Sequence, residues 1–165
     1  MPEARKFLVA AAVVFLAVLS VIAGAVFDCT AMPGRSYQGL LPPLDTADSQ
    51  LQERLRAHVA ALTAIGPRCH QAPGSMAKTV AYIGERMKRC GGKVEFLPFT
   101  YDGEVFTNIA LTFAGSSEAH RGEIVVVGAH CDSVSHTVGA NDNASGVAAL
   151  LALAENCRGA NPGRT

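Results

Sequence analysis

The segment 123–133, with the sequence Glu-Ile-Val-Val-Val-Gly-Ala-His-Cys-Asp-Ser, constrains the fold of this chain most strongly. Its apolar part, 123–129, is short and rich in valine, which predicts a central β-strand covered on both faces. His130 follows at the carboxyl end of that strand, where binding sites form in open α/β sheets. A short loop that begins at Gly139, 139–143, then leads into an apolar helix that we expect over 144–157. The pattern therefore predicts polar side chains gathered at one edge of a sheet.

The residues before this segment predict two helices and a hairpin. Apolar residues recur at helical spacing in 46–65 and again in 75–91, and glycines follow both stretches. Two β-rich stretches, 93–101 and 104–113, are joined by Asp102-Gly103, a strong signal for a tight hairpin turn. Helices, a hairpin and a strand-loop-helix unit in this order predict an α/β fold with a mixed central sheet flanked by helices.

An apolar stretch of 21 residues, Phe7–Phe27, lies near the N-terminus and directly follows Arg5 and Lys6. As a helix it would span roughly 31 Å, the thickness of a hydrocarbon core. The basic flank predicts a cytoplasmic N-terminus, with the residues after Asp28 outside the cytoplasm, in the periplasm or the extracellular space. We expect the rest of the chain to be anchored to the membrane by this helix.

A cleaved signal peptide is the alternative reading of the same stretch. Its length favours an uncleaved signal anchor, whereas Ala23-Gly24-Ala25 supplies a small-residue cleavage pattern that would release a secreted protein. The predicted organisation is therefore a signal anchor or signal peptide over 1–27, a Pro- and Gly-containing linker over 28–45, and a domain over 46–165.

Composition argues against one class of partner and leaves cysteine pairing open. The formal net charge is zero and the sequence shows no basic stripe, so we expect no binding to nucleic acid. Five cysteines are an odd number, and an exported domain would tolerate disulfides. A bridge between Cys69 and Cys90 is one possible pairing.

The residue types at the end of the predicted strand suit metal chemistry. His130 and Asp132 lie two apart on an extended chain, so their side chains leave on the same face. A histidine ligand usually needs a partner that fixes its tautomer, and Asp132 is placed to serve. Asp142 has two carboxylate oxygens and can bridge two cations about 3.5–4 Å apart. Each residue alone has a structural explanation, such as an N-cap role for Asp142, but the combination predicts a metal site.

The stretch Val125–Leu153 resembles the co-catalytic di-zinc exopeptidases, the family of bacterial leucyl aminopeptidases, aminopeptidase Y and glutamate carboxypeptidase II. Its two motifs are G-A-H-C-D-S and G-A-N-D-N-A-S-G-V-A, in that order. The resemblance implies a three-layer α/β sandwich with two zinc ions. It assigns His130 as a zinc ligand, Asp142 as the bridging ligand and Asp132 as the catalytic carboxylate that orients His130. It also implies a cis peptide bond between Asp142 and Asn143.

The activity implied by the resemblance is that of an aminopeptidase, which hydrolyses peptides with a free N-terminus by metal-activated water. The family's Glu-Glu pair, which supplies the general base and a further ligand, has no counterpart here, because Glu155 falls within a predicted helix. The chain thus resembles the N-terminal half of the catalytic domain. We expect these 165 residues alone to be inactive and to bind zinc weakly.

Two other functions remain open at the level of sequence. One is a glutaminyl-cyclase-like acyltransferase, which has the same fold and one zinc ion. The other is a non-catalytic, membrane-anchored ectodomain of that fold. The motif that contains Asp142 favours the peptidase. Cys131 occupies a position where the family usually has Tyr or Leu, and strand alternation points its thiol away from His130.

Overall fold

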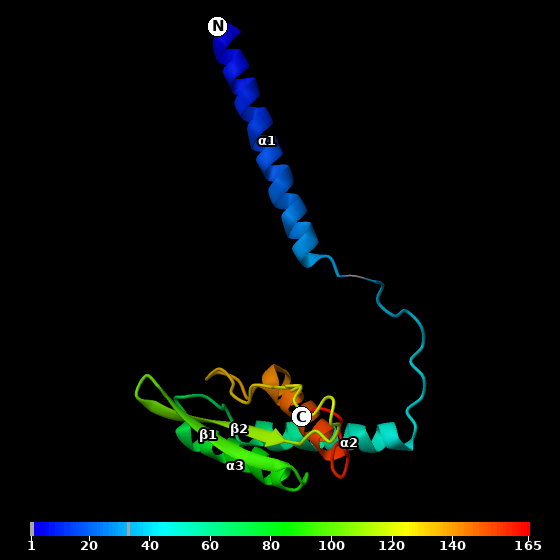
Figure 1. The fold of residues 1–165 in the computed structure, drawn as a ribbon. Helices are drawn as coiled ribbons and strands as arrows, with labels where there is room; N and C mark the ends of the chain where they lie inside the picture. The colour runs from blue at the N-terminus through cyan, green and yellow to red at the C-terminus, as the bar shows by residue number, and fades with distance from the viewer. Residues whose placement is uncertain (1, 33) are drawn as a thin grey trace. The chain divides into compact units, whose positions relative to one another are not determined.

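The structure is a computed structural model that describes residues 2–32 and 34–165. The chain divides into two compact units, Met1–Pro42 and Pro43–Thr165 (Figure 1). Within its described residues the first unit contains one helix, α1 (Pro2–Thr30), whose side chains are all exposed. With 29 residues it is about 44 Å long, and its length and apolar composition suffice to cross a bilayer. A signal sequence would meet the same criterion.

The second unit consists of three helices, a hairpin and an irregular turn. Its elements are α2 (Thr46–Ala64), α3 (Pro73–Lys88), β1 (Lys93–Tyr101), β2 (Glu104–Thr112), the turn η1 (Ala140–Ala144) and α4 (Ser145–Asn156). The carboxylate of Asp45 caps α2 by accepting a hydrogen bond of 2.8 Å from the backbone N–H of Asp48. Pro73 stands in the first turn of α3, where its missing N–H costs nothing.

The hairpin forms as the sequence predicts. Strands β1 and β2 are antiparallel, with Lys93 opposite Thr112 at one end and Tyr101 opposite Glu104 at the other. Asp102 and Gly103 have φ values of 49° and 78°, the positive values that a tight two-residue turn of this kind requires. The hairpin lies beside α3 (Figure 1).

A small apolar core joins α2, α3 and α4. Its buried members are Leu62, Ile83, Met87, Ala144, Val147 and Leu151. Ala144 ends η1 and Val147 lies in the first turn of α4, so the same packing that buries α4 also fixes the turn that precedes it. The fold class is α/β, as predicted.

The predicted central strand over 123–129 is not a strand in the structure. Across the described residues the sheet has two strands, β1 and β2, and neither pairs with this segment. Its valines are uncovered, and Val126 is 85% exposed. Its backbone pairs with Thr165, through Val125 N–H to the Thr165 carbonyl (2.8 Å) and Thr165 N–H to the Glu123 carbonyl (3.0 Å), and Glu123 N–H donates to the His120 carbonyl (2.9 Å). The prediction was wrong because a central strand needs a hydrogen-bonded neighbour on each side.

The possible bridge between Cys69 and Cys90 does not form, and all five cysteines are free thiols. The two residues flank α3, which has 16 residues and is about 24 Å long. A disulfide requires Cα atoms within about 7 Å of each other, and α3 lies between the two cysteines along the chain.

Candidate metal centre

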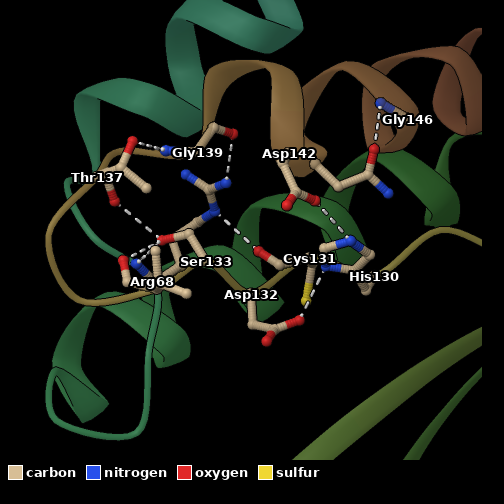
Figure 2. Close-up of polar contacts among 11 residues, drawn as sticks. Arg68, His130, Cys131, Asp132, Ser133, Thr137, Gly139, Asp142 and Gly146 are labelled. Atoms are coloured by element: carbon tan, nitrogen blue, oxygen red, sulfur yellow. Dashed lines mark hydrogen bonds and ion pairs between the residues drawn. The ribbon is translucent and has the colours of Figure 1, made fainter. Parts of the chain in front are cut away.

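The structure brings His130, Asp132 and Asp142 together around one imidazole ring (Figure 2). The ring nitrogen Nδ1 of His130 lies 3.1 Å from Oδ1 of Asp132. The other nitrogen, Nε2, lies 2.9 Å from Oδ1 of Asp142. A neutral imidazole carries one proton, so both contacts are favourable only when the ring is protonated or when another cation lies at one of them.

The three side chains are open to solvent. The side chains of His130, Asp132 and Asp142 are 54%, 63% and 84% exposed, respectively. His130 and Asp132 lie in an open groove whose walls are β2, the segment 124–135 and α4. A dissolved ion or a substrate therefore reaches these groups without any movement of the chain.

The turn η1 presents Asp142 by an irregular backbone. Gly139, just before it, has φ of 54° and ψ of 52°, and the peptide bond between Asp142 and Asn143 is cis, as the resemblance implied. The Asn143 side chain accepts a hydrogen bond of 3.0 Å from the Gly146 N–H in the first turn of α4. In the described chain the Asp142 carboxylate caps no helix, and the polar partner that it does have is His130.

The donor atoms suit a zinc ion by type and by spacing. Zinc binds imidazole nitrogen at about 2.0–2.1 Å and carboxylate oxygen at about 2.0–2.2 Å, which puts two such donors about 3.4 Å apart in a tetrahedral site. Nε2 of His130 and Oδ1 of Asp142 are 2.9 Å apart, so a small outward shift of either side chain would admit the ion. No group of three or more such ligands exists among the described residues. The chain thus offers two donors where catalytic zinc sites usually have three from the protein.

Cys131 points into the protein rather than toward the metal donors. Its side chain packs against the apolar core. Burial raises the pKa of the Cys131 thiol, the neighbouring Asp132 carboxylate raises it further, and the Arg68 guanidinium opposes both. The thiol therefore stays protonated and is a poor ligand.

Arg68 is the one site residue that sequence reasoning missed. Its side chain is fully buried, and its guanidinium donates hydrogen bonds to the Cys131 carbonyl (2.8 Å) and the Gly139 carbonyl (3.0 Å). It thus connects the segment of His130 with the loop of Asp142 (Figure 2). The sequence gives no signal for this role, because an arginine after a Gly-Pro helix stop is normally a solvent-exposed loop residue.

A known protein family matches the C-terminal third of the chain. The family model described as peptidase family M28 matches residues 108–165. The chain is similar to this family over these residues, which are about one third of its length. The M28 segment contains His130, Asp132 and Asp142, together with η1 and α4.

Two curated proteins are similar to the chain over more than its M28 segment. Leupeptin-inactivating enzyme 1 of Streptomyces exfoliatus is 31% identical over 159 residues, which cover 92% of this chain and 34% of that protein. The uncharacterized protein YfbL of Escherichia coli K12 is 32% identical over 111 residues, which cover 62% of this chain and 33% of that protein. The chain spans about one third of the length of these relatives.

The chain is structurally similar, over part of its length, to a solved structure. It is the glutaminyl cyclase of Tannerella forsythia, with a TM-score of 0.47 and 21% sequence identity over 67% of this chain and 42% of that one. The overlap is too small to bear on the function of the M28 segment.

Proposed function

We propose that this chain contributes part of the metal centre of a zinc-dependent exopeptidase, an aminopeptidase of family M28. His130 and Asp142 are the proposed zinc ligands, and Asp132 is the carboxylate that orients His130. The observation that carries the proposal is the position of His130 between two carboxylates, with Nε2 2.9 Å from Asp142 and Nδ1 3.1 Å from Asp132. The M28 match over the same residues supports it.

Asp132 and Asp142 have different proposed roles at the two ring nitrogens of His130. Asp132 accepts the Nδ1–H of His130, which fixes the tautomer and leaves the Nε2 lone pair directed toward Asp142. One oxygen of Asp142 faces that lone pair, and its second oxygen is free for another cation, as a bridging ligand requires. Bound zinc would lower the pKa of a coordinated water and polarise the carbonyl of the scissile peptide bond.

The proposed substrate is a peptide with a free N-terminus, and the proposed location is outside the cytoplasm. In this proposal residues 1–27 are a signal anchor or signal peptide, 28–45 are a linker, and 46–165 are the N-terminal half of a catalytic domain. The apolar helix α1 supports a membrane or export role by its length and composition. Two zinc ions would need donors besides His130 and Asp142, so we expect no peptide hydrolysis by these 165 residues alone.

Zinc binding by the purified chain in detergent micelles tests the proposed ligands. With two protein donors we expect a Kd between about 1 μM and 1 mM, equivalent to about −8 to −4 kcal/mol. His130→Ala and Asp142→Asn should each abolish the calorimetric signal. His136→Ala is the matched control, since it removes an exposed histidine from the loop between the two ligands. Unchanged zinc binding by His130→Ala would contradict the proposal.

The reaction type is tested with the longest product of the gene that contains this sequence. We expect it to release p-nitroaniline from leucine p-nitroanilide in the presence of zinc, with loss of that activity in His130→Ala. Release of ammonia from an N-terminal glutamine peptide, without anilide hydrolysis, would instead indicate the cyclase-like acyl transfer. Absence of both activities, with zinc bound, would indicate a non-catalytic ectodomain.

A further inference from the structure

Arg68 connects three segments of the second unit through main-chain carbonyls. Its guanidinium donates to Cys131, beside His130, and to Val138 and Gly139, which precede the turn of Asp142, at 2.8, 2.5 and 3.0 Å. A fourth bond, of 3.3 Å, reaches the Leu62 carbonyl in the last turn of α2. One rigid planar group thus joins both halves of the candidate metal centre to the helical core (Figure 2).

The main chain of Arg68 reinforces this connection. Its N–H donates to the Ser133 hydroxyl at 3.0 Å, and its carbonyl accepts the Ser133 N–H at 2.7 Å. The Ser133 hydroxyl in turn donates to the Thr137 carbonyl at 3.1 Å. The residue therefore holds the segment after His130 by its backbone and the loop before Asp142 by its side chain.

Packing alone does not account for an arginine at this position. The side chain is 0% exposed, and no carboxylate of the described chain forms an ion pair with it. Burying a charge without a counter-charge is unfavourable, and an apolar side chain would fill the same space at lower cost. An apolar residue, however, would leave the Cys131 and Val138 carbonyls without their donor. It would also remove one of the two donors of the Leu62 and Gly139 carbonyls, which accept the N–H groups of Ile65 and Ala144 as well. The hydrogen bonds are therefore the reason for the arginine.

Only one of the two contacts of His130 depends on such a connection. Asp132 is two residues from His130 in the same segment, so that contact is local. Asp142 lies across the loop, and the distance between its carboxylate and Nε2 depends on how the two segments are held together. Arg68 bonds directly to both segments.

We propose that Arg68 is a positioning residue of the metal centre, which sets the separation between Nε2 of His130 and the Asp142 carboxylate. The part of this proposal that is tested by zinc affinity rests on the proposed function. The part that is tested by the ring nitrogen resonances of His130 rests on the geometry alone. Arg68 itself touches neither ion nor substrate in this role.

The test compares Arg68→Lys and Arg68→Met in the full chain, in micelles, with zinc affinity and the ring nitrogen resonances of His130 as readouts. Lysine keeps the charge but has a single ammonium group in place of the planar fork. We expect the zinc Kd to rise about tenfold or more in both variants, the size of effect typical for residues that orient ligands. Without metal, the Nε2 resonance should shift while the Nδ1 resonance, which reports the Asp132 contact, should not.

Two controls separate positioning from general stability. Arg54→Met removes an arginine that pairs with Glu155 on the helices, away from the loop, and should keep the wild-type Kd. Met87→Ala empties part of the core but removes none of the hydrogen bonds between Arg68 and the two segments, so it should lower stability and leave the Kd and the His130 resonances of the folded chain unchanged. If Met87→Ala and Arg68→Lys both raise the zinc Kd in proportion to their loss of stability, the proposal is overturned.

The remaining outcomes are also decisive. Folded Arg68→Lys with wild-type zinc affinity and an unshifted Nε2 resonance would overturn the positioning role. If the wild-type chain binds no zinc, the proposed function fails, and the shift of Nε2 in metal-free Arg68→Lys alone supports or overturns the role of Arg68. If neither Arg68 variant folds, Ser133→Ala decides, because it removes the acceptor of the Arg68 N–H and the hydroxyl donor to the Thr137 carbonyl, the two side-chain contacts by which Ser133 supports this connection. A shifted Nε2 resonance supports the proposal and an unshifted one overturns it.

Discussion

Arg68 and Gly139 are in direct contact, and the contact leaves no room for a side chain at position 139. Nη2 of Arg68 donates to the Gly139 carbonyl at 3.0 Å. A Cβ atom on Gly139 would lie 2.9 Å from that nitrogen and 2.7 Å from Cβ of Ser133. The φ of 54° at Gly139 also favours glycine, since residues with a Cβ rarely adopt such values.

We therefore predict that Gly139→Ala disturbs the loop of Asp142. The free energy of unfolding should fall by about 1–3 kcal/mol, because the methyl group displaces Arg68 or Ser133 and the backbone is strained. Urea denaturation measures this change. Gly74→Ala is the matched control: a Cβ there meets no atom within 4 Å, and in a helix alanine should be neutral or stabilising by up to about 1 kcal/mol. Equal stability of Gly139→Ala and wild type would contradict the prediction.

The core prediction concerns two leucines of α4. Leu151 is 0% exposed, whereas Leu153 on the same helix is 45% exposed. Leu151→Ala should cost about 2–5 kcal/mol, since it removes buried methyl groups and leaves a cavity. Leu153→Ala should cost less than about 1 kcal/mol, because much of that side chain is already in water. Urea midpoints of the two variants compare them directly, and similar losses would argue against the packing of α4 described above.

The pH dependence of stability should contain a contribution from His58, which lies between three helices. Its Nδ1 is 2.8 Å from the Tyr82 hydroxyl of α3, and its Nε2 is 3.6 Å from Oε1 of Glu155 of α4. Burial lowers the pKa of His58 below its usual value of 6.5; Glu155 opposes this, while Arg86 and Arg54 lower the pKa further.

The sign of the effect follows from that lowered pKa. Below pH 6.5 the unfolded chain takes up a proton at His58 that the folded chain resists, so the free energy of unfolding should fall as the pH drops from 6.5 through the lowered pKa. Unfolding experiments at pH 7.5 and 5.5 should show a smaller difference for His58→Gln than for wild type. His70→Gln, which removes an exposed histidine from the turn before α3, should behave as wild type. The same pH dependence in His58→Gln and wild type would refute this assignment.

Thiol labelling tests the absence of disulfides. Five thiols should react after denaturation without reductant. In the native chain we expect Cys29, which is exposed, to react first and Cys90 to be among the slowest. The pKa of the Cys90 thiol is raised, chiefly by burial, so a smaller fraction of this thiol is in the reactive thiolate form. Titration with Ellman's reagent counts the thiols, and three or fewer in the denatured chain would reveal a disulfide.

Membrane extraction distinguishes the two roles proposed for α1. An uncleaved anchor should keep the chain in the membrane pellet at alkaline pH, with the mass of the intact N-terminus. A signal peptide should be absent from the mature protein, with cleavage after Ala25 as the sequence suggests. Lys substitutions at Val14 and Val18 should prevent stable insertion in the first case. Recovery of the intact chain in the soluble fraction would contradict both roles.

Local features of this protein were determined by the sequence alone. Helical spacing of apolar residues predicted α2 and α3, and an apolar run with few charges predicted α4. Asp102-Gly103 predicted the hairpin turn, because all these signals act between residues near each other in the chain. The two motifs predicted that His130, Asp132 and Asp142 would be neighbours, and the structure does bring them together. Their assignment as catalytic and metal-binding residues stays a prediction.

Contacts between distant residues were decided only by the tertiary structure. The apolar run 123–129 looks like a central strand, but a strand exists only where a neighbouring strand supplies its hydrogen bonds, and in the described chain neither β1 nor β2 pairs with it. Arg68 and Gly139 are 71 residues apart, and no local pattern marks an arginine that will be buried against carbonyls. Sequence patterns report which faces are apolar, whereas the partners of a backbone group are settled by how the chain folds back on itself.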